Sequence, residues 1–195
     1  KEKNDILNKL PDNEEIAKVI LNNLKNNHTK VKQSDDPKET TSIYVVLTDS
    51  IIIANIKNTF TRVQTVAHEC IHSIQDKSVL WFNFIYTNLY NLFFVALIVL
   101  KLFNVINGMI WLTSLVLAGV IYYVVRAYLE NDAMIKAKYV AKEYMEKSNV
   151  LTNEEITKIT TGYEEINAIG VKMYLYRLLL EVLVRTLIFS VICIF

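Results

Sequence analysis

Two uncharged stretches decide the fold of this chain: SVLWFNFIYTNLYNLFFVALIVL at residues 78–100 and LFNVINGMIWLTSLVLAGVIYYVV at residues 102–125. Only Lys101 separates them. A helix of roughly 20 apolar residues crosses a hydrocarbon core about 30 Å thick, so each stretch is long enough to span a membrane. Asparagines and a glycine at residues 104–108 supply the turn between the two stretches. The pattern predicts a transmembrane helical hairpin at residues 78–128.

The rest of the chain is more polar. Residues 1–77 and 129–170 are rich in charge and are expected to form one domain that the hairpin interrupts. Residues 171–195 are apolar but carry charges at four-residue spacing, which would line one face of a helix: Arg177, Glu181 and Arg185. Two structures fit this segment, a third membrane helix with the charged face turned inward or an interfacial amphipathic helix. The uncharged run at the end favours the membrane helix.

Charge and cysteine content exclude some functions. The net charge is +1 over 195 residues, which leaves no basic footprint for a nucleic acid. We therefore expect no nucleic-acid partner. Cys70 lies inside a predicted helix and Cys193 in the apolar C-terminal run, so we do not expect the two cysteines to form a disulfide.

Local patterns predict the elements that precede the hairpin. Asp12 and Glu15 resemble a capping box at the start of a helix. The β-branched run at 43–47 predicts a strand, with a weaker strand around Val31, whereas the apolar run at 51–57 is ambiguous. A helix is expected at about 59–76. Its predicted buried residues are Phe60, Val63, Ala67, Cys70, Ile71 and Ile74.

This last helix carries the sequence His68-Glu69-Cys70-Ile71-His72. Residues four apart lie on one face of a helix, so both imidazoles can reach a single metal ion. Glu69, between them, can face a water on that ion and act as a general base. The alternative is that these are polar residues on a solvated helix. His28, the remaining histidine, is expected in a surface turn.

A zinc site of this kind needs a third protein ligand and an open position for water. Two antiparallel spans return the chain to the side of the membrane that it left, and Glu130 follows the second span directly. Glu130 is therefore the predicted third ligand, and Asp132 is expected to accept an N–H from a ligand histidine. Glu164 and Glu165 are rival ligands. The alternative for Glu130 and Asp132 is a solvated acidic cluster at a helix start.

The segment from Thr65 to Gln75, TVAHECIHSIQ, resembles the metal helix of the neutral zinc metallopeptidase family of bacterial membranes, whose pattern is V-A-H-E-x-x-H-x-I-Q. The segment ENDA that begins at Glu130 resembles the E-x-D-A segment of that family, and the resemblance covers residues 14–145. It implies a zincin-like, gluzincin-type metalloprotease domain, mainly α with a small β element, that a transmembrane hairpin interrupts. It also implies His68 and His72, with Glu130, as zinc ligands and Glu69 as the catalytic base.

The chain departs from this pattern in two places. It lacks the leading membrane helix of the family, and Ile71 stands where the family commonly has glycine. The heat-shock and CaaX-type (prenyl-protein) membrane zinc proteases are the second choice. They usually show E-x-x-A-D after their spans, and Met134 occupies the place of that aspartate.

Together these observations predict a membrane-anchored zinc-dependent endopeptidase with one Zn²⁺ per chain, acting on a peptide or protein substrate beside the lipid bilayer. The alternatives are a non-catalytic membrane scaffold and a zinc-binding pseudoprotease. The hairpin turn has only Lys101 nearby. Five basic residues lie on the side of the predicted site: Lys77, Arg126, Lys136, Lys138 and Lys142. The family resemblance implies a bacterial cell membrane, and the positive-inside rule predicts that the active site lies on its cytoplasmic side.

Overall fold

A computed structural model describes residues 2–36 and 38–194. Most of these residues are helical, and three short strands among them form one sheet. The prediction of a mainly α fold with a small β element is therefore confirmed. The chain divides into two compact units. The first contains the residues up to Asp76 together with 131–170, and the second contains 77–130 together with the residues from Val171 onward.

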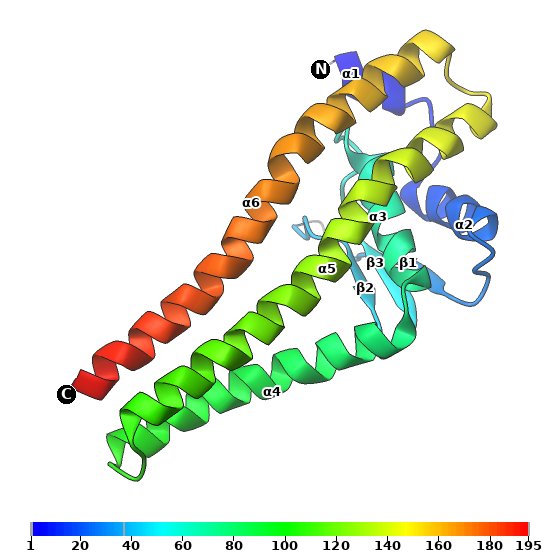
Figure 1. Cartoon of the computed structure of the whole chain (residues 1–195). Coiled ribbons are helices and arrows are strands. Elements are labelled where there is room, and N and C mark those ends of the chain that lie inside the picture. Colours follow the sequence, from blue (N-terminus) through cyan, green and yellow to red (C-terminus); the bar gives the residue numbers. More distant parts are fainter. Residues whose placement is uncertain (1, 37, 195) are drawn as a thin grey trace. The chain divides into compact units, whose positions relative to one another are not determined.

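The first unit contains all of the strands and the shorter helices (Figure 1). Its complete elements are α1 (Glu2–Leu7), α2 (Asn13–Asn23), β1 (Lys30–Gln33), β2 (Ile43–Val45), β3 (Ser50–Ile53) and α3 (Arg62–Ile74). The two longest helices, α5 (Gly108–Ser148) and α6 (Asn153–Ile194), each contribute one end to this unit and the other end to the second unit.

The sheet has the order β1-β3-β2, with β3 parallel to β1 and antiparallel to β2. Ile51 at its centre pairs with Val31 on one side and Tyr44 on the other. The predicted strand at 43–47 is present but ends at Val45, and the weak strand around Val31 is confirmed. The ambiguous run at 51–57 holds most of the central strand, whose isoleucines are largely buried because Ile51 and Ile53 pack into the hydrophobic core of this unit.

Two local predictions in this unit are wrong. Asp12 is the N-cap residue of α2, but its side chain makes no capping hydrogen bond. Its Oδ1 instead accepts a hydrogen bond from Lys57 Nζ at 2.7 Å, because the ammonium is a stronger partner than a backbone amide. Ile74 is 45% exposed rather than buried, since α3 ends at this residue. His28 is exposed in a turn, as predicted.

One core holds the first unit together, and α3 contributes its apolar face to it. Residues of α3 in this core are fully or almost fully buried: Val63, Val66, Ala67, Cys70 and Ile71. The part of α5 in this unit adds a stripe of small side chains at four-residue spacing: Ala133, Ala137 and Ala141. Alanines on one face let the backbone of a neighbouring helix approach closely. The helix that carries His68, Glu69 and His72 therefore has a fixed buried side.

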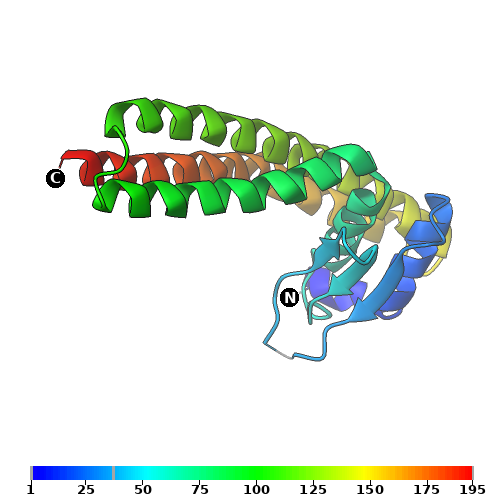
Figure 2. The same cartoon turned by 90° about the horizontal axis from the view of Figure 1, so that it is seen from below.

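The second unit is built from α4 (Lys77–Leu102), residues 108–130 of α5 and residues 171–194 of α6, which run alongside one another (Figure 2). Within the described residues, two helices are long and apolar enough to cross a membrane, α4 and α5. Only 11% and 17% of their apolar windows are buried, so neither is an ordinary core helix of this chain. The chain turns between Leu102 and Gly108, as the sequence predicts.

The C-terminal segment is not a separate element. Helix α6 begins at Asn153 in the first unit and continues without a break to Ile194. Its start is a capping box: Thr152 Oγ1 accepts from the backbone N–H of Glu155, and Glu155 Oε2 accepts from the backbone N–H of Thr152 at 2.9 Å. Residues 153–194 include no proline, so each of them has the backbone N–H that a continuous helix requires.

The charged stripe of α6 lies partly inside the second unit. Glu181 Oε1 is 3.4 Å from Arg177 Nε, and its Oε2 accepts a hydrogen bond from the Tyr122 hydroxyl at 2.9 Å. The Arg185 guanidinium lies over the rings of Tyr90 and Tyr122, 4.9 Å and 5.6 Å from their centroids. Of the three charged residues spaced four apart on α6, Arg177 and Glu181 form an ion pair. Arg185 instead stacks on the two aromatic rings.

Packing at Gly119 gives a stability prediction. A Cβ there would lie 2.5 Å from Val182 Cγ1 and 2.8 Å from Tyr90 Oη, so Gly119→Ala should strain the second unit by about 1–3 kcal/mol. Gly170→Ala is the matched control, since its Cβ would meet only Met134 Cε at 3.4 Å and the change improves helix propensity by about 1 kcal/mol. Thermal unfolding in detergent should place Gly119→Ala below the wild type and Gly170→Ala at or above it. The reverse order would contradict this packing.

Candidate metal centre

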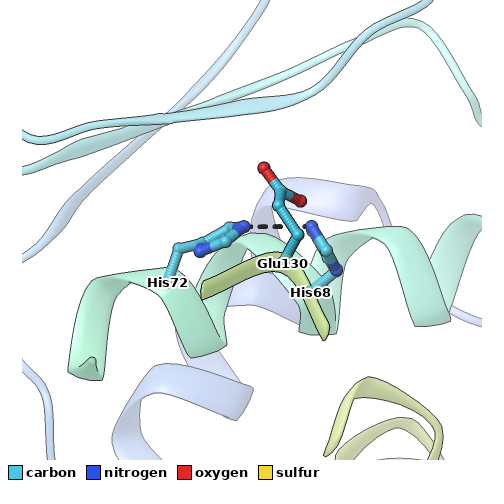
Figure 3. A group of neighbouring side chains, drawn as sticks. All are labelled: His68, His72 and Glu130. Carbon is cyan, nitrogen blue, oxygen red and sulfur yellow. Dashed lines mark hydrogen bonds between the residues drawn. The ribbon is translucent and has the colours of Figure 1, made fainter. Parts of the chain in front are cut away.

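Helix α3 places two histidines one turn apart on its partly exposed side. His68 Nε2 and His72 Nε2 lie 3.0 Å apart, and their rings meet edge to face with centroids separated by 4.6 Å (Figure 3). Both side chains are half-buried. The opposite side of α3 is packed into the core, which fixes the direction in which the face with the two histidines points.

The spacing of the two ring nitrogens suits a shared ion. Zinc binds histidine nitrogen at roughly 2.0–2.1 Å with tetrahedral angles, which places two such nitrogens roughly 3.3 Å apart. The observed 3.0 Å between the Nε2 atoms is close to that separation. Each neutral imidazole has one nitrogen with a free lone pair, and both rings can present it to the same point.

Glu130 supplies a carboxylate at the same place. His68, His72 and Glu130 each offer one ligand atom, and these three atoms lie within 4.8 Å of one another. All three side chains are half-buried. Figure 3 shows the Glu130 carboxylate beside the two rings. Glu130 belongs to α5, which continues as one helix through Asn131 to Ser148, and residues 131–148 of this helix belong to the first unit. Among the residues that the structure describes, this is a group that could hold a metal ion.

Gln75 connects the histidine pair to Asp132. His72 Nδ1 and Gln75 Oε1 are 2.8 Å apart, and Gln75 Nε2 donates to Asp132 Oδ2 at 3.0 Å. Lys136 Nζ forms an ion pair with Asp132 Oδ1 at 2.6 Å. Asp132 was predicted to accept directly from a ligand histidine. The structure corrects this prediction, because an amide side chain lies between the two groups.

The hydrogen bonds of Gln75 favour one tautomer of His72. Partial burial raises the pKa of the Asp132 carboxyl, but hydrogen bonds from Lys136 and Gln75 lower it more, so the pKa is below its ordinary value. The ionised carboxylate only accepts, which turns the Gln75 amide nitrogen toward it and the amide oxygen toward His72. Nδ1 of His72 then carries the proton, and Nε2 is left with its lone pair for an ion. The signal in the sequence was the spacing of three between His72 and Gln75, one helical turn.

The remaining residues of the motif differ in burial and role. Glu69 lies between the histidines on α3 and is only 6% exposed. Its assignment as the general base stays a prediction. Cys70 is fully buried, its Sγ donates to the Ala17 carbonyl at 3.8 Å, and burial raises the pKa of its thiol. Cys70 is therefore a core residue, and both it and Cys193 are free thiols.

The rival ligands lie elsewhere. Glu164 and Glu165 are exposed on α6. Glu164 Oε1 pairs with Lys138 Nζ at 3.4 Å. Neither glutamate belongs to the group formed by His68, His72 and Glu130. The structure therefore favours Glu130 over both rivals.

Comparisons of the chain with models of known protein families, with curated proteins and with solved structures return no match.

Proposed function

We propose that this chain is a membrane-anchored zinc-dependent endopeptidase with one Zn²⁺ per chain. The observation that carries the proposal is the convergence of His68, His72 and Glu130 within 4.8 Å, on and beside the helix that also carries Glu69. Two imidazole nitrogens and one carboxylate are a donor set that zinc uses in catalytic sites, where the fourth position is left for water. The donor chemistry of the residues therefore fits the ion.

The fold and family belong to the same proposal. A zincin-like domain would comprise residues 1–77 and 129–170, with the hairpin inserted at 78–128. Support comes from the small sheet beside the motif helix and from the resemblance to the neutral zinc metallopeptidase family. The heat-shock and CaaX-type proteases remain the second choice.

In the proposed mechanism the protein side chains hold, orient and move protons. Zinc, when bound, would supply Lewis acidity and would make water a better nucleophile near neutral pH. His68, His72 and Glu130 would hold the ion, and Gln75 would keep the Nε2 lone pair of His72 available to it. Glu69 takes a proton from the attacking water and then passes it to the leaving amine of the cleaved peptide bond.

The proposed location is a bacterial cell membrane. Helix α4 and the apolar part of α5 are long enough to span it, and their side chains are mostly exposed in this chain. At 1.5 Å per residue the 41-residue α5 is about twice as long as a span requires, so its second half extends beyond the lipid. The basic residues near the site favour its cytoplasmic placement. The end of α6 stays predicted as a third membrane helix, with an interfacial helix as the alternative.

Metal analysis with a cleavage assay tests this function. Purified protein in detergent should contain one zinc per chain and cleave a quenched fluorescent peptide library. A chelator should abolish cleavage, and added zinc should restore it. His68→Ala should lose both zinc and cleavage. His28→Ala is the matched control, because this histidine is exposed in a turn of the same unit, and it should keep both.

The possible outcomes separate the alternatives. A wild-type chain with zinc and no cleavage of any peptide would indicate the zinc-binding pseudoprotease. A chain that binds no zinc would indicate the non-catalytic membrane scaffold. Equal zinc contents in His68→Ala and the wild type would contradict the assigned site.

A further inference from the structure

We propose that Tyr174 is a positioning residue for Glu130, and that Arg126 holds Tyr174 in place. The inference rests on the proposed role of Glu130 as a metal ligand. It goes beyond that role because it assigns a task to a residue of α6. All three residues belong to the second unit.

Hydrogen bonding and helix spacing connect Arg126, Tyr174 and Glu130. Arg126 and Glu130 are four residues apart on α5, so they share a face of that helix. Arg126 Nε donates a hydrogen bond to the Tyr174 hydroxyl at 3.1 Å. The same hydroxyl is within hydrogen-bonding reach of the Glu130 side chain. The hydroxyl of Tyr174 on α6 is therefore held at the α5 face that carries both charged residues.

The direction of these hydrogen bonds follows from the chemistry of the groups. A guanidinium only donates, so the Tyr174 oxygen accepts from Arg126 and its single proton is free to be donated elsewhere. The Glu130 carboxylate is an acceptor within reach. A hydroxyl that donates to a carboxylate makes a charge-assisted bond, which is stronger and more directional than a bond between neutral groups.

The consequence concerns the orientation of the ligand. A carboxylate on a flexible glutamate side chain loses rotamer freedom when it binds an ion. A hydrogen bond from Tyr174 would restrain the Glu130 carboxylate before the ion binds, at the place where one of its oxygens lies within 4.8 Å of the ligand atoms of His68 and His72. Outer partners of metal ligands typically contribute about 10- to 100-fold in metal affinity. We expect a contribution of that size from the Tyr174 hydroxyl.

Removing the hydroxyl alone tests this inference. Tyr174→Phe should weaken zinc binding by about 10- to 100-fold, measured by competition with a chromophoric chelator. The visible absorption bands of the cobalt-substituted protein should also shift, because the carboxylate geometry at the ion changes. Tyr176→Phe is the matched control on the same helix, since its ring is 69% exposed, and it should match the wild type in both measurements.

A structural role would give a different result. If Tyr174 only packs α6 against α5, Tyr174→Phe retains the ring and should leave zinc affinity and the cobalt spectrum unchanged, which would overturn the inference. If Tyr174→Phe does not fold, Arg126→Met provides the second test. This substitution removes the hydrogen bond from Arg126 Nε to the Tyr174 hydroxyl and should also weaken zinc binding. Unchanged affinity in that variant would likewise overturn the inference.

Failure here is distinct from failure of the proposed function. Equal zinc affinities in the wild type and Tyr174→Phe would contradict the role of Tyr174 but not the metal centre. If the variants differ in zinc affinity but the wild type cleaves no peptide, the proposed peptidase activity is contradicted and the positioning role is not. If the wild type binds no zinc, both proposals are contradicted.

Discussion

Glu69→Gln is expected to lower kcat for peptide cleavage by about 10²- to 10⁴-fold, the usual contribution of a general base. Glutamine has nearly the shape of glutamate but cannot take a proton from water. Glu69 is only 6% exposed, so a residue of equal size should be accommodated without disturbing α3. Zinc content should stay at one per chain, because the proposed ligands are His68, His72 and Glu130.

A matched control distinguishes loss of the general base from the general effect of removing one negative charge. Glu165→Gln makes the same substitution at an exposed position on α6 and should leave both kcat and zinc unchanged. Wild-type cleavage by a Glu69→Gln protein that retains its metal would sink the assignment of Glu69. Loss of zinc together with cleavage would instead show that Glu69 supports the metal centre.

Glu130→Ala is expected to weaken zinc binding by more than about 100-fold, beyond the range found for partners outside the ligand shell. The substitution removes one of three proposed protein ligands and leaves a water in its place. It should reduce cleavage in parallel, because the ion is then rarely bound at ordinary zinc concentrations. Competition with a chromophoric chelator measures the affinity, and a peptide assay at several zinc concentrations shows whether excess metal restores the rate.

Glu164→Ala serves as the comparison for Glu130→Ala. Glu164 was a rival ligand, and the structure places it on the exposed surface in an ion pair with Lys138. An exposed ion pair contributes little, so this variant should match the wild type in zinc affinity. Equal affinities in Glu130→Ala and the wild type would mean that the third ligand is another residue or is absent.

Much of the fold could be predicted because the signals are local. The lengths of the two apolar stretches and the turn between them follow from hydropathy alone. The extent of α6 did not follow, because polar and apolar halves of one helix resemble two separate elements. The side chain of Asp12 also escaped prediction. Its partner, Lys57, is 45 residues away, and a distant ammonium competes with the local cap.

The candidate site shows the same division. The sequence predicted that His68, His72 and Glu130 belong together, and the structure brings their ligand atoms within 4.8 Å. The sequence did not predict that Gln75 lies between His72 and Asp132. The position of Gln75 depends on how α5 packs within the first unit, and the local sequence pattern does not specify that packing.

The sequence by itself determined the pair of histidines on one face of α3 and the return of the chain after the hairpin. Both depend on helix periodicity and hydropathy, which act over a few residues or along one uninterrupted stretch. Only the tertiary structure decided which side chains support the predicted ligands. Gln75 meets Asp132 across 57 residues, and Arg126 meets Tyr174 across 48. Such contacts depend on the packing of one helix against another, which no local pattern specifies.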